Sequence, residues 1–278
     1  MTVFLVAVLL AERPLSGVVF WQWRKPRGNR SLSEMDIEGI PVLYETEELL
    51  IINKPAGIAT LAPPGIDSLE VRIRRYLASK NPLAVGLSGK VYLGMPHRLD
   101  RPVTGVLVFG KTRRATRRLA RQFERRQVRK IYWACVQGTV QPEEGTWYDL
   151  VRKIPEEPRG EIASSDHPDA QLAILHYRVR GYFPWGTWLE IELETGRFHQ
   201  IRIQAASRGH PVLGDFLYGS QIPFGPQVED WRLRPIALHA RSIQFVDPIS
   251  QLPLYVVAPL WPSWEALGIY DNADPEGS

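Results

Sequence analysis

The chain has 278 residues, of which 44% are hydrophobic and 23% are charged, and its formal net charge is +4 at pH 7. This length allows one large domain or two small ones with a substantial core. The single cysteine, Cys135, excludes an intramolecular disulfide and argues against a thiolate-rich metal site, so a cytoplasmic protein is expected. No run approaches the roughly eighteen apolar residues that a membrane-spanning helix needs, so no membrane association is expected.

The two ends of the chain are expected to lie outside the folded domain. Residues 1–36 are expected to form a flexible extension. Within it, residues 2–10 are as apolar as the centre of an export signal, but no basic segment precedes them and no clear cleavage site follows, so export is not favoured. The ordered domain is expected to span residues 37–265, and residues 266–278 are expected to be an acidic tail.

The spacing of apolar residues predicts an alternation of strands and helices along this domain. Strands are expected at 41–45, 49–53, 106–109, 131–136, 172–180, 187–194 and 242–246, and helices at 68–79, 111–126 and 199–206. The Gly- and Pro-containing residues 181–186 predict a hairpin turn between the two strands that flank them. Between residues 140 and 176 the chain is expected to be rich in loops.

The predicted helix at 111–126 is strongly basic. From Lys111 to Lys130 the chain has ten Lys and Arg residues against a single acid, Glu124. Five arginines that lie mostly off its apolar face are Arg113, Arg114, Arg117, Arg118 and Arg121. A solvated basic helix is a simple explanation, but so many like charges repel one another unless a counter-charge is bound. Contact with the phosphates of a nucleic acid is therefore the preferred interpretation.

A carboxylate stands between two arginines directly before a predicted buried strand. The segment His97–Phe109 reads HRLDRPVTGVLVF and contains Asp100 between Arg98 and Arg101. An aspartate at this place is costly unless its charge is used, and flanking guanidinium groups favour its ionised form. A salt-bridged turn is the structural alternative.

Two later segments carry polar residues in a similarly suggestive pattern. Tyr132 lies in the predicted strand of KIYWACVQG, where a tyrosine is most often core packing. The segment ETGRFHQIRI contains Arg197 and His199, and it turns the chain into a helix that carries Arg202.

Together the three segments resemble the motifs of the RluA-type pseudouridine synthases, enzymes that isomerise uridine in RNA. HRLD followed by a small-residue turn resembles the active-site motif, Lys-x-Tyr-x-Ala a second motif, and TGRFHQIR a third. The resemblance covers residues 40 to 262, with the motifs in the family's order. It implies an α+β fold with a mixed, mostly antiparallel central sheet, flanking helices and an RNA-binding cleft. It also implies a single catalytic domain without an S4 domain, for which the preceding residues are too few.

The resemblance further implies roles for individual residues. Asp100 would be the nucleophile, Arg202 its ion-pair partner, and Tyr132 the ring that lies against the uracil. Arg98 would occupy the space that the extruded base leaves, and Arg101, Arg197 and His199 are expected to contact RNA. Attack on C6 of the base and action on the ribose both remain open. Because uracil supplies its own carbon nucleophile, no cofactor is expected. None of the six histidines has metal-ligand spacing, so no metal is expected either.

Asp215 and Gln204 are not expected to take part in the chemistry. Asp215 could suggest a paired-carboxylate mechanism with Asp100, but it is interpreted as a helix or loop cap. Gln204 replaces a histidine that many relatives carry two places after the arginine, and it is expected to affect packing more than chemistry.

The expected partner is RNA, either ribosomal or transfer RNA, bound by a monomer. Two other functions stay open. A non-catalytic RNA-binding or ribosome-assembly factor on the same fold would keep its phenotype after Asp100→Asn. An enzyme for free nucleosides would not need the basic helix, so neutralising four of its arginines would leave turnover unchanged.

Overall fold

The computed structural model describes residues 19–21, 36–81 and 91–271. The α-helices are α1 (Leu69–Lys80), α2 (Arg113–Glu124) and α3 (Gln200–Ser207). The strands are β1 (Val19–Trp21), β2 (Asp36–Ile37), β3 (Ile40–Glu45), β4 (Leu49–Lys54), β5 (Thr104–Gly110), β6 (Arg129–Gln137), β7 (Glu144–Lys153), β8 (Gly160–Ile162), β9 (Gln171–Phe183), β10 (Gly186–Leu193), β11 (Leu238–Val246) and β12 (Pro253–Val257). Short 3-10 turns follow at Phe216–Tyr218, Trp231–Leu233 and Pro262–Leu267.

One 12-stranded sheet runs through the whole structure in the order β2-β3-β4-β5-β11-β6-β10-β9-β7-β8. The pairs β5–β11 and β1–β12 are parallel, and the other pairs are antiparallel. Strand β11 pairs with β5 and β6 and so joins the two halves of the sheet, while β12 continues along β11. The expected α+β fold with a mostly antiparallel sheet is confirmed.

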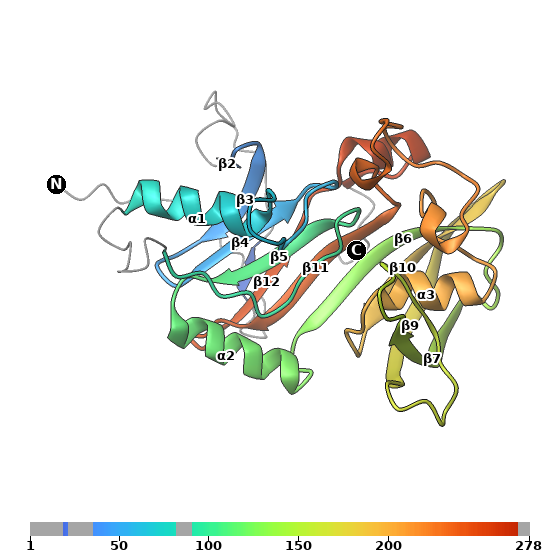
Figure 1. The fold of residues 1–278 in the computed structure, drawn as a ribbon, viewed down its shortest axis with the longest axis horizontal. Coiled ribbons are helices and arrows are strands. Elements are labelled where there is room, and N and C mark those ends of the chain that lie inside the picture. Colours follow the sequence, from blue (N-terminus) through green and yellow to red (C-terminus); the bar gives the residue numbers. More distant parts are fainter. Residues whose placement is uncertain (1–18, 22–35, 82–90, 272–278) are drawn as a thin grey trace.

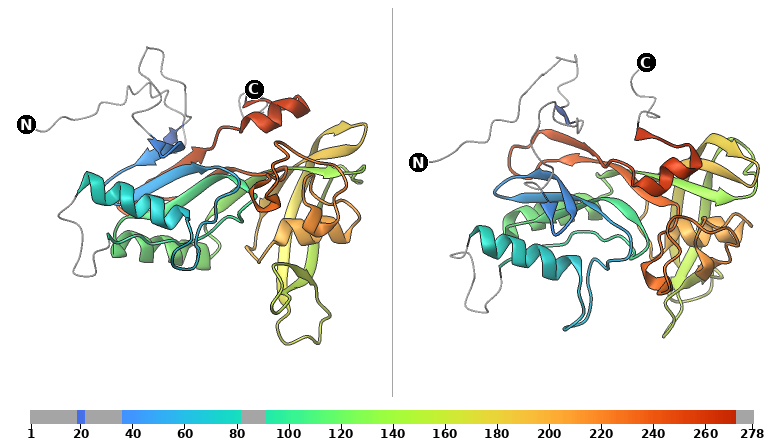
Figure 2. Two further views of the ribbon diagram at one scale, coloured as in Figure 1. Left: turned by 45° about the horizontal axis from the view of Figure 1, so that its top comes forward. Right: turned by 90° about the horizontal axis from the view of Figure 1, so that it is seen from above.

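The helices cover one side of the sheet. Helices α1 and α2 lie over the half that contains β3, β4 and β5, and α3 lies over the half that contains β7 and β9 (Figure 1; Figure 2). Ala115 and Leu119 turn the apolar face of α2 into the core, and Leu69, Ile73 and Leu77 do the same for α1. The arginines of α2 are thereby left toward solvent.

Most predicted elements are confirmed, with ends that differ by at most four residues, the largest difference being the start of β11. The side chains of Ser68 and Thr112 cap α1 and α2: each accepts a hydrogen bond from the backbone N–H three residues later, which explains where the two helices begin. The hairpin expected around residues 181–186 is the pair β9 and β10, closed by a tighter turn.

The expectation of loops between residues 140 and 176 is wrong. Strands β7 and β8 lie there, and β7 pairs with β9 from Glu144 to Val151. Only Trp147 and Val151 of β7 are buried, so the strand has no alternating apolar pattern, and turn residues at 154–159 follow it. Cross-strand pairing stabilises this region where local propensity is weak.

Both ends of the expected domain extend further than the sequence indicates. Val19–Trp21, inside the expected extension, pairs with β12, whereas most of residues 1–36 lie outside the described residues. At the other end Ile269 is buried, and Asp271 forms an ion pair with Arg241 at 2.8 Å. The boundary expected at residue 265 therefore falls within a packed segment.

Candidate active site

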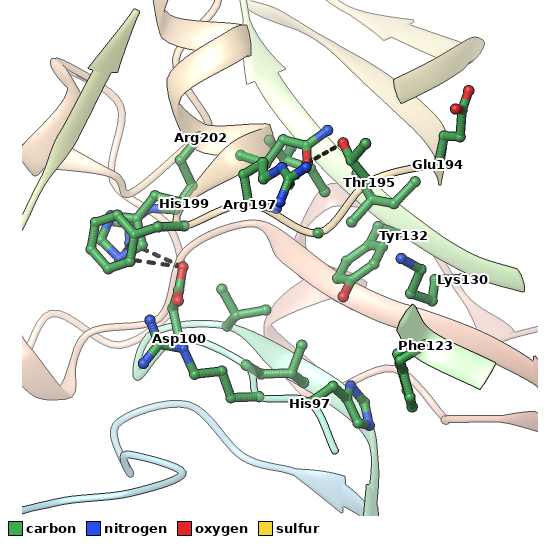
Figure 3. Close-up of a pocket in the computed structure, with 18 of the residues that line it drawn as sticks. His97, Asp100, Phe123, Lys130, Tyr132, Glu194, Thr195, Arg197, His199 and Arg202 are labelled. Atoms are coloured by element: carbon green, nitrogen blue, oxygen red, sulfur yellow. Dashed lines mark hydrogen bonds and ion pairs between the residues drawn. The ribbon is translucent and has the colours of Figure 1, made fainter. Parts of the chain in front are cut away.

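A cavity of about 580 Å³ opens between the loop before β5, the end of α2, strand β6 and the turn between β10 and α3 (Figure 3). Its volume lies within the range of about 300–1,000 Å³ that is typical of small-molecule sites. Asp100, Tyr132 and Arg202, predicted from three distant motifs, all line this cavity. Asp100 faces His199 and Arg202, whereas Tyr132 and Lys130 lie across the cavity from it (Figure 3).

A buried lysine forms hydrogen bonds to the loop that carries Asp100. The Nζ atom of Lys54 donates to the carbonyl oxygens of Pro55, Arg101 and Val103 at 2.8, 3.1 and 2.8 Å. The lysine is fully buried, and burial lowers its pKa to about 7. An ammonium group has three N–H bonds, and here each has its own acceptor. Lys54 therefore ties the end of β4 to the three residues that directly follow Asp100.

A glycine brings the same loop close to β11. Gly105 has φ +115°, and a Cβ atom there would lie 2.3 Å from the carbonyl oxygen of Ala240. Only glycine fits this close approach of two backbones. Ala240 pairs with Tyr132 on the other side of β11, so this contact sets the separation between the Asp100 loop and Tyr132.

Arg202 reaches Asp100, but its principal partner is another carboxylate. Its Nη1 atom lies 3.4 Å from Oδ2 of Asp100. Its Nε and Nη2 atoms donate to Oδ2 and Oδ1 of Asp215 at 2.6 and 2.9 Å, in a two-point pairing in which both side chains are buried. Such pairing fixes the plane of the guanidinium. Asp215 thus aims Arg202 at Asp100, and its interpretation as a cap is wrong, because its side chain caps no helix.

His199 lines the cavity beside Asp100. Its side chain is only 9% exposed, and its Nε2 atom lies 3.5 Å from Oδ2 of Asp100. Burial lowers its pKa to about 4, so the ring is neutral at pH 7. Nε2 accepts a hydrogen bond from Nη1 of Arg202 at 3.0 Å, because arginine can only donate, and this leaves the ring proton on Nδ1, 2.8 Å from the hydroxyl of Tyr218. The residue adopts a left-handed conformation with φ 50° directly before α3.

Tyr132 and Lys130 form the opposite wall. Tyr132 is partly buried, and burial with the nearby Asp100 charge raises the pKa of its hydroxyl group, so the phenol stays neutral. Burial also lowers the pKa of Lys130 to about 8. A neutral aromatic ring opposite a carboxylate is suited to hold a flat base against it.

The turn that carries Arg197 is fixed by a buried glutamine. Oε1 of Gln200 accepts from the Thr195 hydroxyl at 2.8 Å and from the backbone N–H of Arg197 at 3.0 Å. Arg197 lines the cavity and donates from Nε to the carbonyl oxygen of Leu172 at 2.9 Å. Two hydrogen bonds to one glutamine oxygen therefore hold the turn that this motif forms.

The remaining predicted RNA contacts fall into two groups. Arg98 is exposed at the cavity, and Arg113, Arg114, Arg117 and Arg121 are exposed along α2. Within the described part of the chain, none of these five forms an ion pair.

Two of the arginines that were predicted to contact RNA form hydrogen bonds within the protein. Arg118 is partly buried and donates to the carbonyl oxygen of Pro248. Arg101 is partly buried, and its backbone carbonyl accepts from Lys54 and from the N–H of Gly57.

Sequence reasoning missed Lys54 and Tyr218, and it named Asp215 only as a cap. Lys54 precedes a proline and resembles the end of a strand, so no local signal marks it. Asp215 and Tyr218 lie in the segment GDFLYG, whose density of polar and aromatic residues was the available signal. Gln204 meets its expected packing role: it is buried, and its Nε2 atom donates to Asp149 at 2.6 Å.

Two general searches of the described residues found nothing further. No cluster of three or more His, Cys, Asp or Glu side chains is arranged to hold a metal ion among them. No helix in the same residues has the length and apolar character to cross a membrane.

Solved structures share this fold. Human RNA Pseudouridylate Synthase Domain Containing 4 superposes with a TM-score of 0.64 at 23% identity, covering 83% of this chain and 90% of that chain. Human RNA Pseudouridylate Synthase Domain Containing 1 gives 0.61 at 23% identity, with 83% and 88% coverage. At this identity the likeness supports the fold alone.

Sequence comparison reaches further. A ribosomal large subunit pseudouridine synthase D of Xylella fastidiosa is 32% identical over 266 residues, which cover 93% of this chain and 77% of that protein. An uncharacterized RNA pseudouridine synthase of Synechocystis sp. is 33% identical over 231 residues, with 83% and 68% coverage. The sequence profile described as RNA pseudouridylate synthase matches residues 48–207. The chain therefore belongs to the RNA pseudouridylate synthase family, and its resemblance to the RluA-type enzymes is confirmed.

Proposed function

We propose that this protein converts uridine to pseudouridine in RNA with Asp100 as the nucleophile. Membership of the family supports the reaction, and the position of Asp100 supports its role. Its side chain is 22% exposed in the wall of the cavity, with Arg202 at 3.4 Å and Tyr132 across the space. This combination of access and a fixed cationic neighbour is the observation on which the proposal rests.

The net reaction replaces the carbon–nitrogen bond between ribose and uracil by a carbon–carbon bond. The bond between C1′ of the ribose and N1 of uracil breaks, the base turns, and C5 bonds to C1′. The proton on C5 is lost and N1 gains one, so no oxidant, reductant or second substrate is consumed. In the proposed sequence the carboxylate of Asp100 either adds to the base or acts on the ribose, and both routes use the same ionised oxygen.

The other wall residues have supporting roles in this proposal. Arg202, aimed by Asp215, stabilises the negative charge on Asp100 and keeps its Oδ2 atom oriented. Tyr132 stacks on the uracil while the base turns, and Arg98 occupies the place that the extruded base leaves in the RNA. An unstacked loop nucleotide is the cheapest target, because extrusion from a duplex costs about a few kcal/mol.

The basic helix α2 is proposed to hold the RNA backbone. Arg113, Arg117 and Arg121 are four residues apart and exposed. A helix rises 1.5 Å per residue, so the Cα atoms of consecutive members are about 6 Å apart along one face, and long arginine side chains from such a row can contact successive phosphates. Arg126 and Lys130 extend this row of positive charge to the cavity wall.

Ribosomal RNA is the proposed substrate, because relatives that match most of this chain are named ribosomal large subunit pseudouridine synthases. The test is to map pseudouridine by carbodiimide-based sequencing of total RNA from cells with and without the gene. A site present only with the gene, and lost when the gene carries Asp100→Asn, is expected in ribosomal RNA. A lost site in transfer RNA would change the substrate class, and identical maps would refute the proposed activity.

A further inference from the structure

An aromatic ring with two cations beside it lies at the cavity next to Asp100. Phe198 stacks on His199, with ring centroids 3.8 Å apart and planes at 16°, and it lines the cavity. The guanidinium of Arg98 lies 5.8 Å from the centre of the phenyl ring, and Nζ of Lys153 lies 5.9 Å from it. The sequence analysis did not predict a role for Phe198, because the segment TGRFHQIR was interpreted from its polar residues.

Three separate elements supply this arrangement. Arg98 comes from the loop before β5, Lys153 ends β7, and Phe198 lies in the turn between β10 and α3. Arg98 and Lys153 are both exposed, and within the described residues neither forms an ion pair. The ring attracts each cation, but two like charges beside one another repel, so the arrangement favours an anionic ligand that carries a flat group.

We propose that Phe198, Arg98 and Lys153 form a subsite for the nucleotide adjacent to the target uridine. The base of that nucleotide stacks on Phe198, a phosphate beside it lies against Lys153, and Arg98 stands between this nucleotide and the place that the extruded base has left. This inference rests on the proposed function, because it assigns the next position along the same RNA strand. Stacking on an aromatic side chain accepts any base, so the subsite strengthens binding without reading sequence.

The position of the subsite relative to Asp100 gives it a second consequence. His199 lies between the two, in contact with the phenyl ring on one side and 3.5 Å from Asp100 on the other. A neighbouring base held on Phe198 would keep the strand from following the extruded uridine into the cavity. The subsite thus holds the RNA backbone still while the target base turns.

The test uses a twelve-residue oligouridylate with one central 5-iodouridine, which cross-links under ultraviolet light to aromatic rings stacked on it. Mass spectrometry of the peptides is expected to identify Phe198 as a cross-linked residue, in addition to Tyr132. In parallel, fluorescence anisotropy with the unmodified oligonucleotide is expected to show a Kd about 5- to 100-fold higher for Phe198→Leu. Phe198→Trp should bind within about threefold of the unaltered protein, because it keeps a larger stacking surface.

Controls separate the subsite from loss of structure and from general charge. Trp185 is 37% exposed and stacks on Phe183 in the β9–β10 turn, so Trp185→Leu removes a comparable ring elsewhere and should leave Kd unchanged. Lys153→Gln should weaken binding, whereas Lys80→Gln, whose lysine pairs with Glu45, should not.

The outcomes distinguish the inference from the function beneath it. Pseudouridine formation on large-subunit RNA at subsaturating concentration should fall in Phe198→Leu in proportion to the rise in Kd, because the lost stacking surface raises KM. Cross-links at Tyr132 alone, or a loss of kcat with unchanged Kd, would overturn the subsite and make Phe198 a support for His199. Failure of the unaltered protein to bind the oligonucleotide would overturn the subsite, whereas failure to form pseudouridine on large-subunit RNA would overturn the proposed function itself.

Discussion

The pairing of Arg202 with Asp215 gives the sharpest prediction about how the site is held. Asp215→Asn keeps the size of the side chain and one oxygen acceptor but removes the charge opposite a buried guanidinium. Both side chains of the pair are at most 5% exposed, so water cannot replace the lost partner. Removing one member of a buried ion pair costs about 3–5 kcal/mol. For a chain of this size the melting temperature should fall on the order of 10 °C.

The same change should alter catalysis through Asp100. Without Asp215 the only carboxylate within reach of Arg202 among the described residues is Asp100, now 3.4 Å away. We expect the guanidinium to move toward it and to form a tighter pair, which restrains the nucleophile and lowers kcat about tenfold or more. The Kd for RNA should stay unchanged, because neither residue belongs to the basic surface of α2.

Calorimetry and pseudouridine formation on transcribed RNA would measure the two effects. Asp67→Asn is the matched control, because Asp67 pairs with Arg72 at 2.6 Å on the surface, where its side chain is 52% exposed. A surface pair is worth about 0–1 kcal/mol, so this control should leave both the melting temperature and kcat near their original values. Equal behaviour of the two variants would refute the assignment of Asp215 as the residue that positions Arg202.

Three further predictions concern stability, pH and RNA binding. Lys54→Met leaves the carbonyl groups of Pro55 and Val103 without this donor, while that of Arg101 keeps the N–H of Gly57; since each lost bond costs about 1–3 kcal/mol, urea unfolding should show a loss of at least about 2 kcal/mol. The pKa of His199 is lowered from 6.5 to about 4, so between these pH values the unfolded chain binds more protons than the folded one. The free energy of unfolding should therefore fall as the pH drops from 6.5 to 4, and it should fall less steeply in His199→Gln. Changing Arg113, Arg117 and Arg121 together to Gln should weaken RNA binding and reduce the slope of log K against log salt by about 2.

Each of these predictions has a control at the surface. Lys80→Met removes an exposed lysine, and His176→Gln an exposed histidine, so neither should reproduce the stability changes. Neutralising Arg72, Arg75 and Arg178, which pair with acids on other faces, should leave the salt slope unchanged. A slope that falls equally in both triple variants would assign RNA binding to net charge and not to α2.

The sequence was sufficient for the parts of the site that local motifs specify. Asp100, Tyr132 and Arg202 were predicted from separate segments and line one cavity, because each motif carries its own turn or strand boundary. The basic character of α2 was also readable, since helical spacing separates its buried face from its exposed arginines.

What sequence could not supply depends on long-range contacts. Asp215 pairs with Arg202 only because the segment after α3 folds back, so nothing around either residue indicates a two-point pairing. Lys54 is followed by a proline that ends the strand, and its side chain donates to carbonyl groups 47 and 49 residues away in the sequence. Strands β7 and β8 were missed because their stability comes from pairing with β9 and not from their own composition.

The central claim is that the carboxylate of Asp100 performs the isomerisation. RNA labelled with tritium at C5 of uridine releases one tritium for each pseudouridine formed, so release measures the chemical step directly. The account predicts release by the unaltered protein and none by Asp100→Asn, with equal RNA binding and equal melting behaviour in the two proteins. Tritium release by Asp100→Asn at the original rate would contradict it.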